Sequence, residues 1–209
     1  MKEKDLIGIP WRVAFALQDD GWILRSDVIW AKKNPMPESV TDRPTKAHEY
    51  VFLFAKSPRY WYDAEAIREP AIKGSANAGP RNYVAGSIGN QRKFLSQTEQ
   101  SVEDGRNART VWTIPTRGNS LAHFAMMPPE LARRCIVSGC PKGGIVFDPF
   151  MGGGTTAIEA RKAGRHYIGS ELNPEYAAMA RNRLALGDET TKAIDRGEPT
   201  TLPLPFEGM

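Results

Sequence analysis

The first hydrophobic pattern along the chain is helical. Within residues 5–18 the apolar side chains recur at helical spacing, at Leu6, Ile9, Val13, Phe15, Ala16 and Leu17. Asp19-Asp20-Gly21 then brings together residues that favour turns. The start of the chain therefore predicts one helix followed by a turn.

Two strand-like runs follow this helix. Residues 22–32 and 48–56 are dense in aliphatic and aromatic residues, which favours strands, and we expect the two to pair. An irregularity is expected in the first strand at Ser26-Asp27. Residues 33–47 contain Asn34-Pro35-Met36-Pro37, which cannot continue a sheet, so a loop is predicted there.

The periodic pattern disappears between about residues 63 and 118. Gly, Asn, Ser, Gln and Arg are frequent in this stretch, and aliphatic residues are scarce. Such a long irregular insertion is usually either functional or a solvated, mobile loop, and both interpretations stay open. Ordered structure is expected again from Trp112. A helix is predicted after Pro128-Pro129, and a polar, loosely ordered tail over 188–209.

A glycine-rich β-α-β unit is the strongest local signal. An apolar strand over 144–147 ends in Asp148, and a second strand over 166–170 ends in Glu171, 23 residues after Asp148. At about 20 residues' spacing the second carboxylate of such a unit reaches a ribose hydroxyl pair. Glycines between the strands allow a ligand to approach the backbone, and a helix start favours electron-rich atoms. The turn and the helix start are formed by Gly152, Gly153, Gly154, Thr155 and Thr156.

Composition narrows the class of protein. The 209 residues, 41% hydrophobic and 25% charged, suit one domain, or one domain with an inserted lobe. A net charge of +4 is compatible with nucleic acid. Cys135 and Cys140, without a histidine cluster, predict neither a metal site nor a disulfide framework, and we expect them reduced and buried. No apolar run approaches the ~20 residues that span a bilayer, and residues 1–5, Met-Lys-Glu-Lys-Asp, do not resemble a signal peptide. We therefore expect a cytoplasmic protein without membrane contact.

The glycine unit resembles the cofactor motif of S-adenosylmethionine-dependent amino-methyltransferases that act on DNA. Its form, Asp148-Pro149-Phe150-x-Gly152-x-Gly154-Thr155-Thr156, looks like that of the β class, which methylates adenine N6 or cytosine N4. Residues 10–17, 21–35 and 43–50 are also similar to this class, most of all to phage and prophage members. A dinucleotide site would instead place G-x-G-x-x-G directly after the strand, and a plain glycine turn without a nucleoside is the other alternative.

The resemblance implies an α/β, Rossmann-like methyltransferase fold in circularly permuted order. Its core would comprise 1–62 and 112–187, with a target-recognition insertion over 63–111 that contacts double-stranded DNA. Glu171 would bind the ribose hydroxyls of S-adenosylmethionine, while Asp148 would lie near the methionine end or cap the next helix. The implied cofactor residues are Phe124, Pro128, Asp148, Phe150, Gly152, Gly154, Thr155, Thr156, Glu171 and Asn173. The implied DNA contacts are Lys32, Arg43, Lys46, Arg81, Arg92 and Lys93.

The catalytic element of the family is missing from these residues. That element is Asp/Ser/Asn-Pro-Pro-aromatic, whose oxygen accepts from the target amine and whose ring stacks on the flipped base. The only Pro-Pro pair, Pro128-Pro129, is preceded by Met127, which cannot usefully accept that hydrogen bond, and followed by Glu130, which cannot stack on a base. We therefore expect the C-terminal part of a methyltransferase without its central strands: completed by another polypeptide, truncated or decayed. The expected function is site-specific DNA methylation of the restriction-modification kind, with a catalytically inactive DNA- or cofactor-binding remnant as the alternative.

Overall fold

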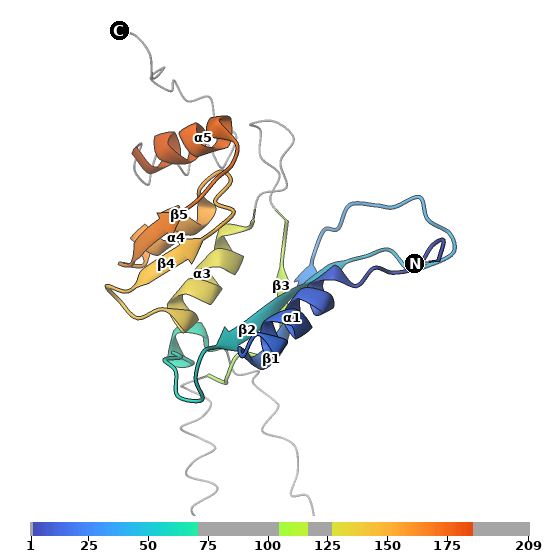
Figure 1. Cartoon of the computed structure of the whole chain (residues 1–209), viewed down its shortest axis with the longest axis horizontal. Coiled ribbons are helices and arrows are strands. Elements are labelled where there is room, and N and C mark those ends of the chain that lie inside the picture. Colours follow the sequence, from blue (N-terminus) through green and yellow to red (C-terminus); the bar gives the residue numbers. More distant parts are fainter. Residues whose placement is uncertain (1, 71–104, 117–126, 186–209) are drawn as a thin grey trace, which may run out of the picture. The chain divides into compact units, whose positions relative to one another are not determined.

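The computed structural model describes residues 2–70, 105–116 and 127–185 (Figure 1). The chain divides into two units, one formed by Met1–Tyr62 with Thr110–Met209 and the other by Asp63–Arg109. The elements of the first unit are α1 (Ile9–Asp19), β1 (Ile23–Lys32), β2 (His48–Ala55), β3 (Val111–Ile114), α3 (Pro129–Gly139), β4 (Ile145–Asp148), α4 (Thr155–Lys162), β5 (His166–Gly169) and α5 (Pro174–Ala185).

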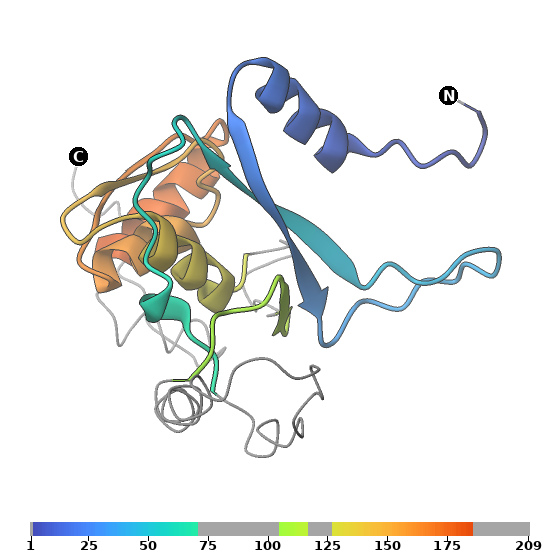
Figure 2. The same ribbon diagram turned by 90° about the horizontal axis from the view of Figure 1, so that it is seen from below.

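The first sheet has the strand order β2-β1-β3. β1 and β2 are antiparallel, which confirms the predicted pair, and their register shifts between Leu24 and Ser26, close to the predicted irregularity. β3 pairs in parallel with β1 and was not predicted as a strand, because its four residues are too few to show a period. Residues 33–47 form the predicted loop, which projects beyond the ends of β1 and β2 in Figure 2.

Both faces of this sheet carry large side chains. Trp30 and Trp112 are register partners on one face; both are buried, and the Trp30 indole N–H donates to the Ile114 carbonyl oxygen at 2.8 Å. On the other face, the ring of Trp11 from α1 lies 5.4 Å from Tyr50 and 4.9 Å from Phe52, in edge-on contacts. Edge-on aromatic pairs of this kind stabilise beyond their buried area. The first sheet is therefore held by aromatic packing.

The second sheet contains β4 and β5, which are parallel and joined by α4, as the β-α-β pattern predicts. A small core of Ala132 and Ile136 from α3 and Ala160 from α4 packs against Val146 on one face of β4. α5 follows β5. It starts at Pro174, a residue favoured at a first helical position, and the Asn173 side-chain oxygen accepts from the Glu175 backbone N–H at 2.8 Å. The Asn-Pro-Glu sequence thus explains where this helix begins.

The second unit is described by itself and only at its two ends. A short 3-10 helix, η1 (Glu65–Ile67), precedes Glu69, which forms an antiparallel bridge with Arg106. The Glu69 carboxylate also contacts Arg106 and Arg109, both at 3.1–3.2 Å. Burial raises the pKa of Glu69, but hydrogen bonds from Arg109 and the two positive charges together outweigh it and lower that pKa. Glu69 and these arginines therefore tie the two ends of the insertion together.

One expectation about the core is wrong. The cysteines are free, as predicted, but Cys135 is exposed and Cys140 is partly exposed rather than buried. The reason is the face of α3 on which Cys135 lies: its neighbour Ile136 and, one turn earlier, Ala132 face the core instead. In the described ranges we find no helix with the length and apolar character to cross a membrane. Those same ranges hold no cluster of three or more side chains suited to a metal ion.

Candidate functional site

Asp148, the last residue of β4, holds the two ends of the glycine turn. Its Oδ1 accepts from the Phe150 backbone N–H at 2.9 Å, and its Oδ2 accepts from the Thr156 hydroxyl at 2.6 Å. The N-cap of α4 is Gly154, and no side chain caps that helix. Asp148 is therefore not the N-cap of α4, which was the alternative to a position near the cofactor. The Thr156 hydroxyl donates to Asp148.

Glu171 stands on the other side of the turn, immediately after β5. Its Oε2 accepts from the Gly152 backbone N–H at 2.7 Å, and its Oε1 accepts from the Asn173 backbone N–H at 2.9 Å. These backbone hydrogen bonds, from Asn173 first and then from Gly152, lower the pKa of Glu171. The carboxylate is therefore ionised at neutral pH. Because β4 and β5 are parallel neighbours, their carboxyl ends bring both acids to one edge of the sheet.

The glycines of the turn have different surroundings. Gly152 and Gly154 both have positive φ, at 53° and 82°, where other residues are strained. A side chain at Gly154 would meet the Cβ of Ala180 on α5 at 3.0 Å, whereas one at Gly152 would have only the Phe150 carbonyl oxygen nearby, at 3.9 Å. Gly154 thus serves the packing of α5 against the turn, and Gly152 leaves its outer side open.

The other predicted cofactor residues are distributed around this turn. Phe150 is 87% exposed, and Thr155 is buried at the start of α4. Pro128 is fully buried, and its carbonyl oxygen accepts from the backbone N–H groups of Leu131 and Ala132 at the start of α3. Asn173 begins α5. Phe124 lies outside the described residues, so its predicted contact stays a prediction.

One residue that contacts the turn was not predicted from the sequence. Arg183, in the last turn of α5, is only 3% exposed, and its Nη1 donates to the carbonyl oxygen of Gly153. The sequence signal for this contact is that Arg183 follows Ala180 by three residues, which places both on one face of a helix. The signal can be used only once α5 has been identified as a helix.

The predicted DNA contacts have mixed surroundings. Lys32 forms an ion pair with Glu49 at 2.5 Å and lies 5.2 Å from the centre of the Trp30 ring. Arg43 forms an ion pair with Glu38 at 2.6 Å, and Lys46 is exposed. Arg81, Arg92 and Lys93 lie outside the described residues. Lys32 and Arg43 thus have acidic neighbours within the chain, and their role toward phosphates stays a prediction.

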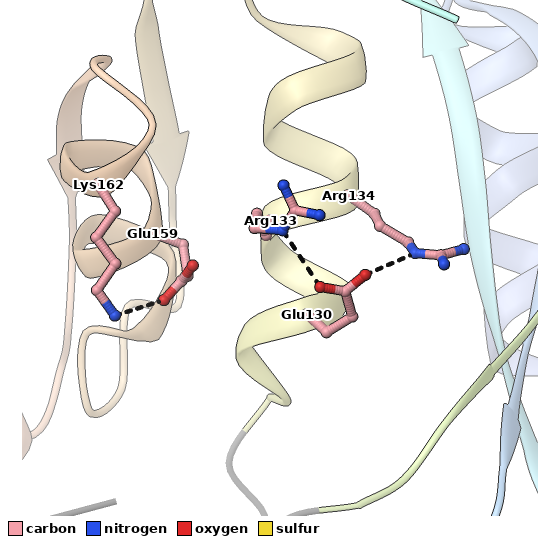
Figure 3. Close-up of polar contacts among 5 residues, drawn as sticks. All are labelled: Glu130, Arg133, Arg134, Glu159 and Lys162. Carbon is pink, nitrogen blue, oxygen red and sulfur yellow. Dashed lines mark hydrogen bonds and ion pairs between the residues drawn. The ribbon is translucent and has the colours of Figure 1, made fainter. Parts of the chain in front are cut away.

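The start of α3 carries an ionic cluster (Figure 3). Glu130 accepts from Arg133 at 3.2 Å and from Arg134 at 2.9 Å, and the Arg134 guanidinium lies 5.5 Å from the centre of the Trp112 ring. Burial raises the pKa of Glu130, but the hydrogen bonds and charges of both arginines outweigh it and lower that pKa. The Glu130 carboxylate is therefore engaged by two arginines of its own helix. This agrees with its exclusion as a base-stacking or catalytic residue.

One face of the β4–β5 pair is left uncovered by the part of the chain that the structure describes. The register places Phe147 beside Ile168, with Ile145 on the same face of β4. These side chains are 62%, 55% and 63% exposed, respectively. Parallel strands are usually covered on both faces, so this apolar face, directly next to the turn, is suited to bind another polypeptide or a ligand.

Comparison with known proteins identifies the family. A family model described as DNA methylase, for N6 and N4 methyltransferases, matches residues 1–182. The chain belongs to this family. It is 46% identical to the type II methyltransferase M.Cfr9I of Citrobacter freundii over 91% of the chain and 53% of that relative. It is 45% identical to the type II methyltransferase M.SmaI of Serratia marcescens over 88% of the chain and 54% of that relative. The chain thus spans about half the length of these curated relatives.

Solved structures support the fold. The PvuII DNA methyltransferase, which is cytosine-N4-specific, matches with a TM-score of 0.62 and 20% identity, over 95% of the chain and 67% of that protein. M1.HpyAVI in complex with SAM matches with a TM-score of 0.56 and 20% identity, over 85% and 70% of the two chains. The expected Rossmann-like methyltransferase fold is confirmed.

Proposed function

We propose that the chain is the cofactor-binding part of a site-specific DNA amino-methyltransferase. It would use S-adenosylmethionine to methylate the exocyclic amine of adenine or cytosine. The observation that carries this proposal is the pair of carboxylates, Asp148 and Glu171, held by backbone hydrogen bonds on either side of one glycine turn. The type II methyltransferases similar to this chain support the reaction class.

The geometry suits a nucleoside with a charged amino-acid end. Each oxygen of Glu171 accepts one backbone N–H and keeps a further lone pair, so both ribose hydroxyls can still bind. Asp148, kept in place by the Thr156 hydroxyl, would receive the ammonium of the methionine part. Gly152 gives backbone access and Phe150 an exposed ring to cover the nucleoside. Thr155, Asn173, Pro128 and Phe124 would complete the pocket.

Titration calorimetry with S-adenosylmethionine tests this assignment. Glu171→Ala should weaken binding about ten- to a hundredfold, because the ribose hydroxyls lose a charged acceptor. Glu175→Ala is the matched control: it removes an exposed carboxylate four residues away and keeps the backbone N–H that Asn173 caps. Equal weakening in both variants, or none at Glu171, contradicts the role of Glu171 in the pocket.

Recognition of double-stranded DNA is assigned to the insertion, residues 63–111, with Lys32, Arg43 and Lys46. Basic residues of this kind release counterions when they neutralise phosphates, so the affinity should fall steeply with salt. Replacing Arg81, Arg92 and Lys93 together by Ala should weaken the electrophoretic shift at low salt and flatten its salt dependence. An unchanged shift across the salt series would refute this assignment.

The catalytic acceptor is proposed to come from a complementing polypeptide that carries Ser- or Asp-Pro-Pro-aromatic. In the reaction the amine nitrogen bonds the methyl carbon, the carbon–sulfur bond breaks, and the amine proton leaves for the acceptor and solvent. Two observations support this proposal. No such turn occurs in the 209 residues, and Ile145, Phe147 and Ile168 offer an apolar face beside the cofactor turn.

The second candidate function is a catalytically inactive cofactor- or DNA-binding protein, favoured by Met127 and Glu130 around the only Pro-Pro pair. Tritiated methyl transfer to mixed-sequence DNA separates the two candidates. The chain alone should show no multiple turnover, and adding the complementing segment in trans should restore it. Turnover by the chain alone overturns the proposed acceptor, whereas inactivity with every complementing segment favours the inactive protein. The cytoplasmic location and the phage or prophage affinity stay predictions.

A further inference from the structure

A buried arginine lies beneath the glycine turn. Arg183 on α5 is almost completely buried, and its Nη1 donates to the Gly153 carbonyl oxygen. Taking a guanidinium out of water is unfavourable unless it gains strong partners. A positive charge near the C-terminus of a helix is favourable, but the exposed Arg181, two residues earlier on α5, already supplies one. The helix dipole therefore does not explain why Arg183 is buried.

The contact with Gly153 is part of a network that fixes three consecutive residues. The Gly152 N–H donates to Glu171 at 2.7 Å, and the Gly154 N–H donates to the Met151 carbonyl oxygen at 3.0 Å. With the Gly153 carbonyl bound to Arg183, the peptide between Gly153 and Gly154 is held at both its oxygen and its N–H. A glycine peptide without these bonds would rotate at little cost, because no side chain restricts it.

α5 supports the turn at a second point. The Cβ of Ala180 lies 3.0 Å from the position that a Cβ on Gly154 would take, and Ala180 is three residues before Arg183 on the same helical face. The small residue lets the helix approach the turn, and the arginine then reaches the neighbouring carbonyl. The two contacts together set the position of the turn relative to Glu171.

We propose that Arg183 is a positioning residue for the cofactor site: it acts through the Gly153 carbonyl to hold the glycine turn in the conformation that receives S-adenosylmethionine. This inference rests on the proposed function for its ligand. In this role Arg183 acts through its contact with the Gly153 carbonyl oxygen and not by contact with the cofactor. Its contribution is preorganisation, since a turn that is already ordered loses less entropy when the ligand binds.

The experiment compares Arg183→Met, Arg183→Lys and the matched control Arg181→Met in the full chain. Calorimetry with S-adenosylmethionine is performed at a temperature at which circular dichroism shows each variant folded, so that lost stability alone does not change the affinity. Arg183→Met should weaken binding roughly tenfold, since a charged hydrogen bond to the turn is lost. Arg183→Lys should recover part of the affinity, because an ammonium still donates to one carbonyl but lacks the planar fork. Arg181→Met should bind like the original chain.

Amide hydrogen exchange at Gly154, followed by NMR, is the second measurement and needs no ligand. Exchange should be faster in both Arg183 variants and unchanged in Arg181→Met. The proposal is overturned if Arg183→Met binds S-adenosylmethionine and exchanges the Gly154 amide as the unsubstituted chain does. Where Arg183→Met does not fold, the same outcome in Arg183→Lys overturns it. If the original chain binds no S-adenosylmethionine, the proposed function fails, while Gly154 exchange still decides whether Arg183 holds the turn.

Discussion

The two sheets of the first unit differ in how far their apolar side chains are buried. In the β2-β1-β3 sheet, Trp30, Trp112 and Ile114 are buried, and α1 adds aromatic contacts on the other face. In the β4–β5 pair, one face packs against α3 and α4, while Ile145 and Phe147 on the other face are mostly exposed. The candidate cofactor turn lies at the end of the β4–β5 pair and not at the three-stranded sheet.

This difference indicates that the first sheet mainly stabilises the fold, whereas the β4–β5 pair carries the candidate binding site. The first sheet is stabilised chiefly by apolar burial, and its polar groups at the ends form ion pairs such as Lys32 with Glu49. The turn of the second sheet is stabilised by hydrogen bonds between backbone N–H groups and the carboxylates of Asp148 and Glu171. A turn held in this way keeps its outer surface available, which is what a ligand site requires.

The largest effect is expected in the aromatic sheet. Trp30→Ala removes a buried indole and its hydrogen bond to Ile114, and it should lower the free energy of unfolding by about 3–5 kcal/mol. Trp61→Ala is the matched control, because Trp61 is 43% exposed and should lose well under half as much. Urea denaturation of both variants measures the difference. Similar losses in the two variants would mean that the aromatic packing of this sheet is not its main support.

Gly154→Ala tests how closely α5 packs on the turn. The substitution adds strain at φ 82° and a contact with Ala180, so the free energy of unfolding should fall by about 2–4 kcal/mol. Gly164→Ala is the control, because Gly164 has φ 70° and an added Cβ would meet no atom of the described residues within 4 Å. Only about 1 kcal/mol is therefore expected, from the backbone strain. Thermal unfolding gives both values. If Gly164→Ala were as destabilising, the contact between the turn and α5 would have no energetic weight.

The open face of β4 is tested by neighbouring residues. Val146 packs against the α3–α4 core, and Val146→Ala should lower the free energy of unfolding by about 1 kcal/mol. Phe147→Ser removes a larger side chain from the exposed face and should change it by less than about 0.5 kcal/mol. A larger loss for Phe147→Ser, measured by urea denaturation of the isolated chain, shows that this face is already covered in solution.

The smallest effect is a pH dependence of the turn. The pKa of Glu171 is lowered on folding because its ionised carboxylate accepts backbone hydrogen bonds. The stabilisation of the turn by Glu171 is therefore complete above the ordinary carboxyl pKa range, and it is lost as pH falls through the lowered pKa of the folded chain. Affinity for S-adenosylmethionine should therefore stay level from pH 7 to about 5 and fall only below about 4.3, the ordinary value for glutamate. Calorimetry across pH measures this, and Glu171→Gln should abolish the step. A step above pH 5 that persists in Glu171→Gln assigns it to another group.

Much of this arrangement is predictable from local sequence. The β4-α4-β5 unit follows from two apolar runs, each ended by an acid, with glycines between them, and the pairing of β1 with β2 follows from their composition. β3 is not predictable, because its four residues pair with β1 some 80 positions away and carry no period of their own. The place of Arg183 under Gly153 depends on how α5 packs, which no spacing within the turn records. Whether Asp148 caps α4 or spans the turn is likewise decided by tertiary geometry.

The most direct test of the account is NMR mapping of S-adenosylmethionine on the isotopically labelled chain. Because the proposed site lies between Asp148 and Glu171, the amide signals of Gly152, Gly154 and Asn173 should shift with the ligand concentration. Those of Trp30 and Tyr50 in the aromatic sheet should stay in place. Shifts centred on the aromatic sheet, or none at the turn with millimolar ligand, would contradict the assignment of the cofactor to the β4–β5 edge.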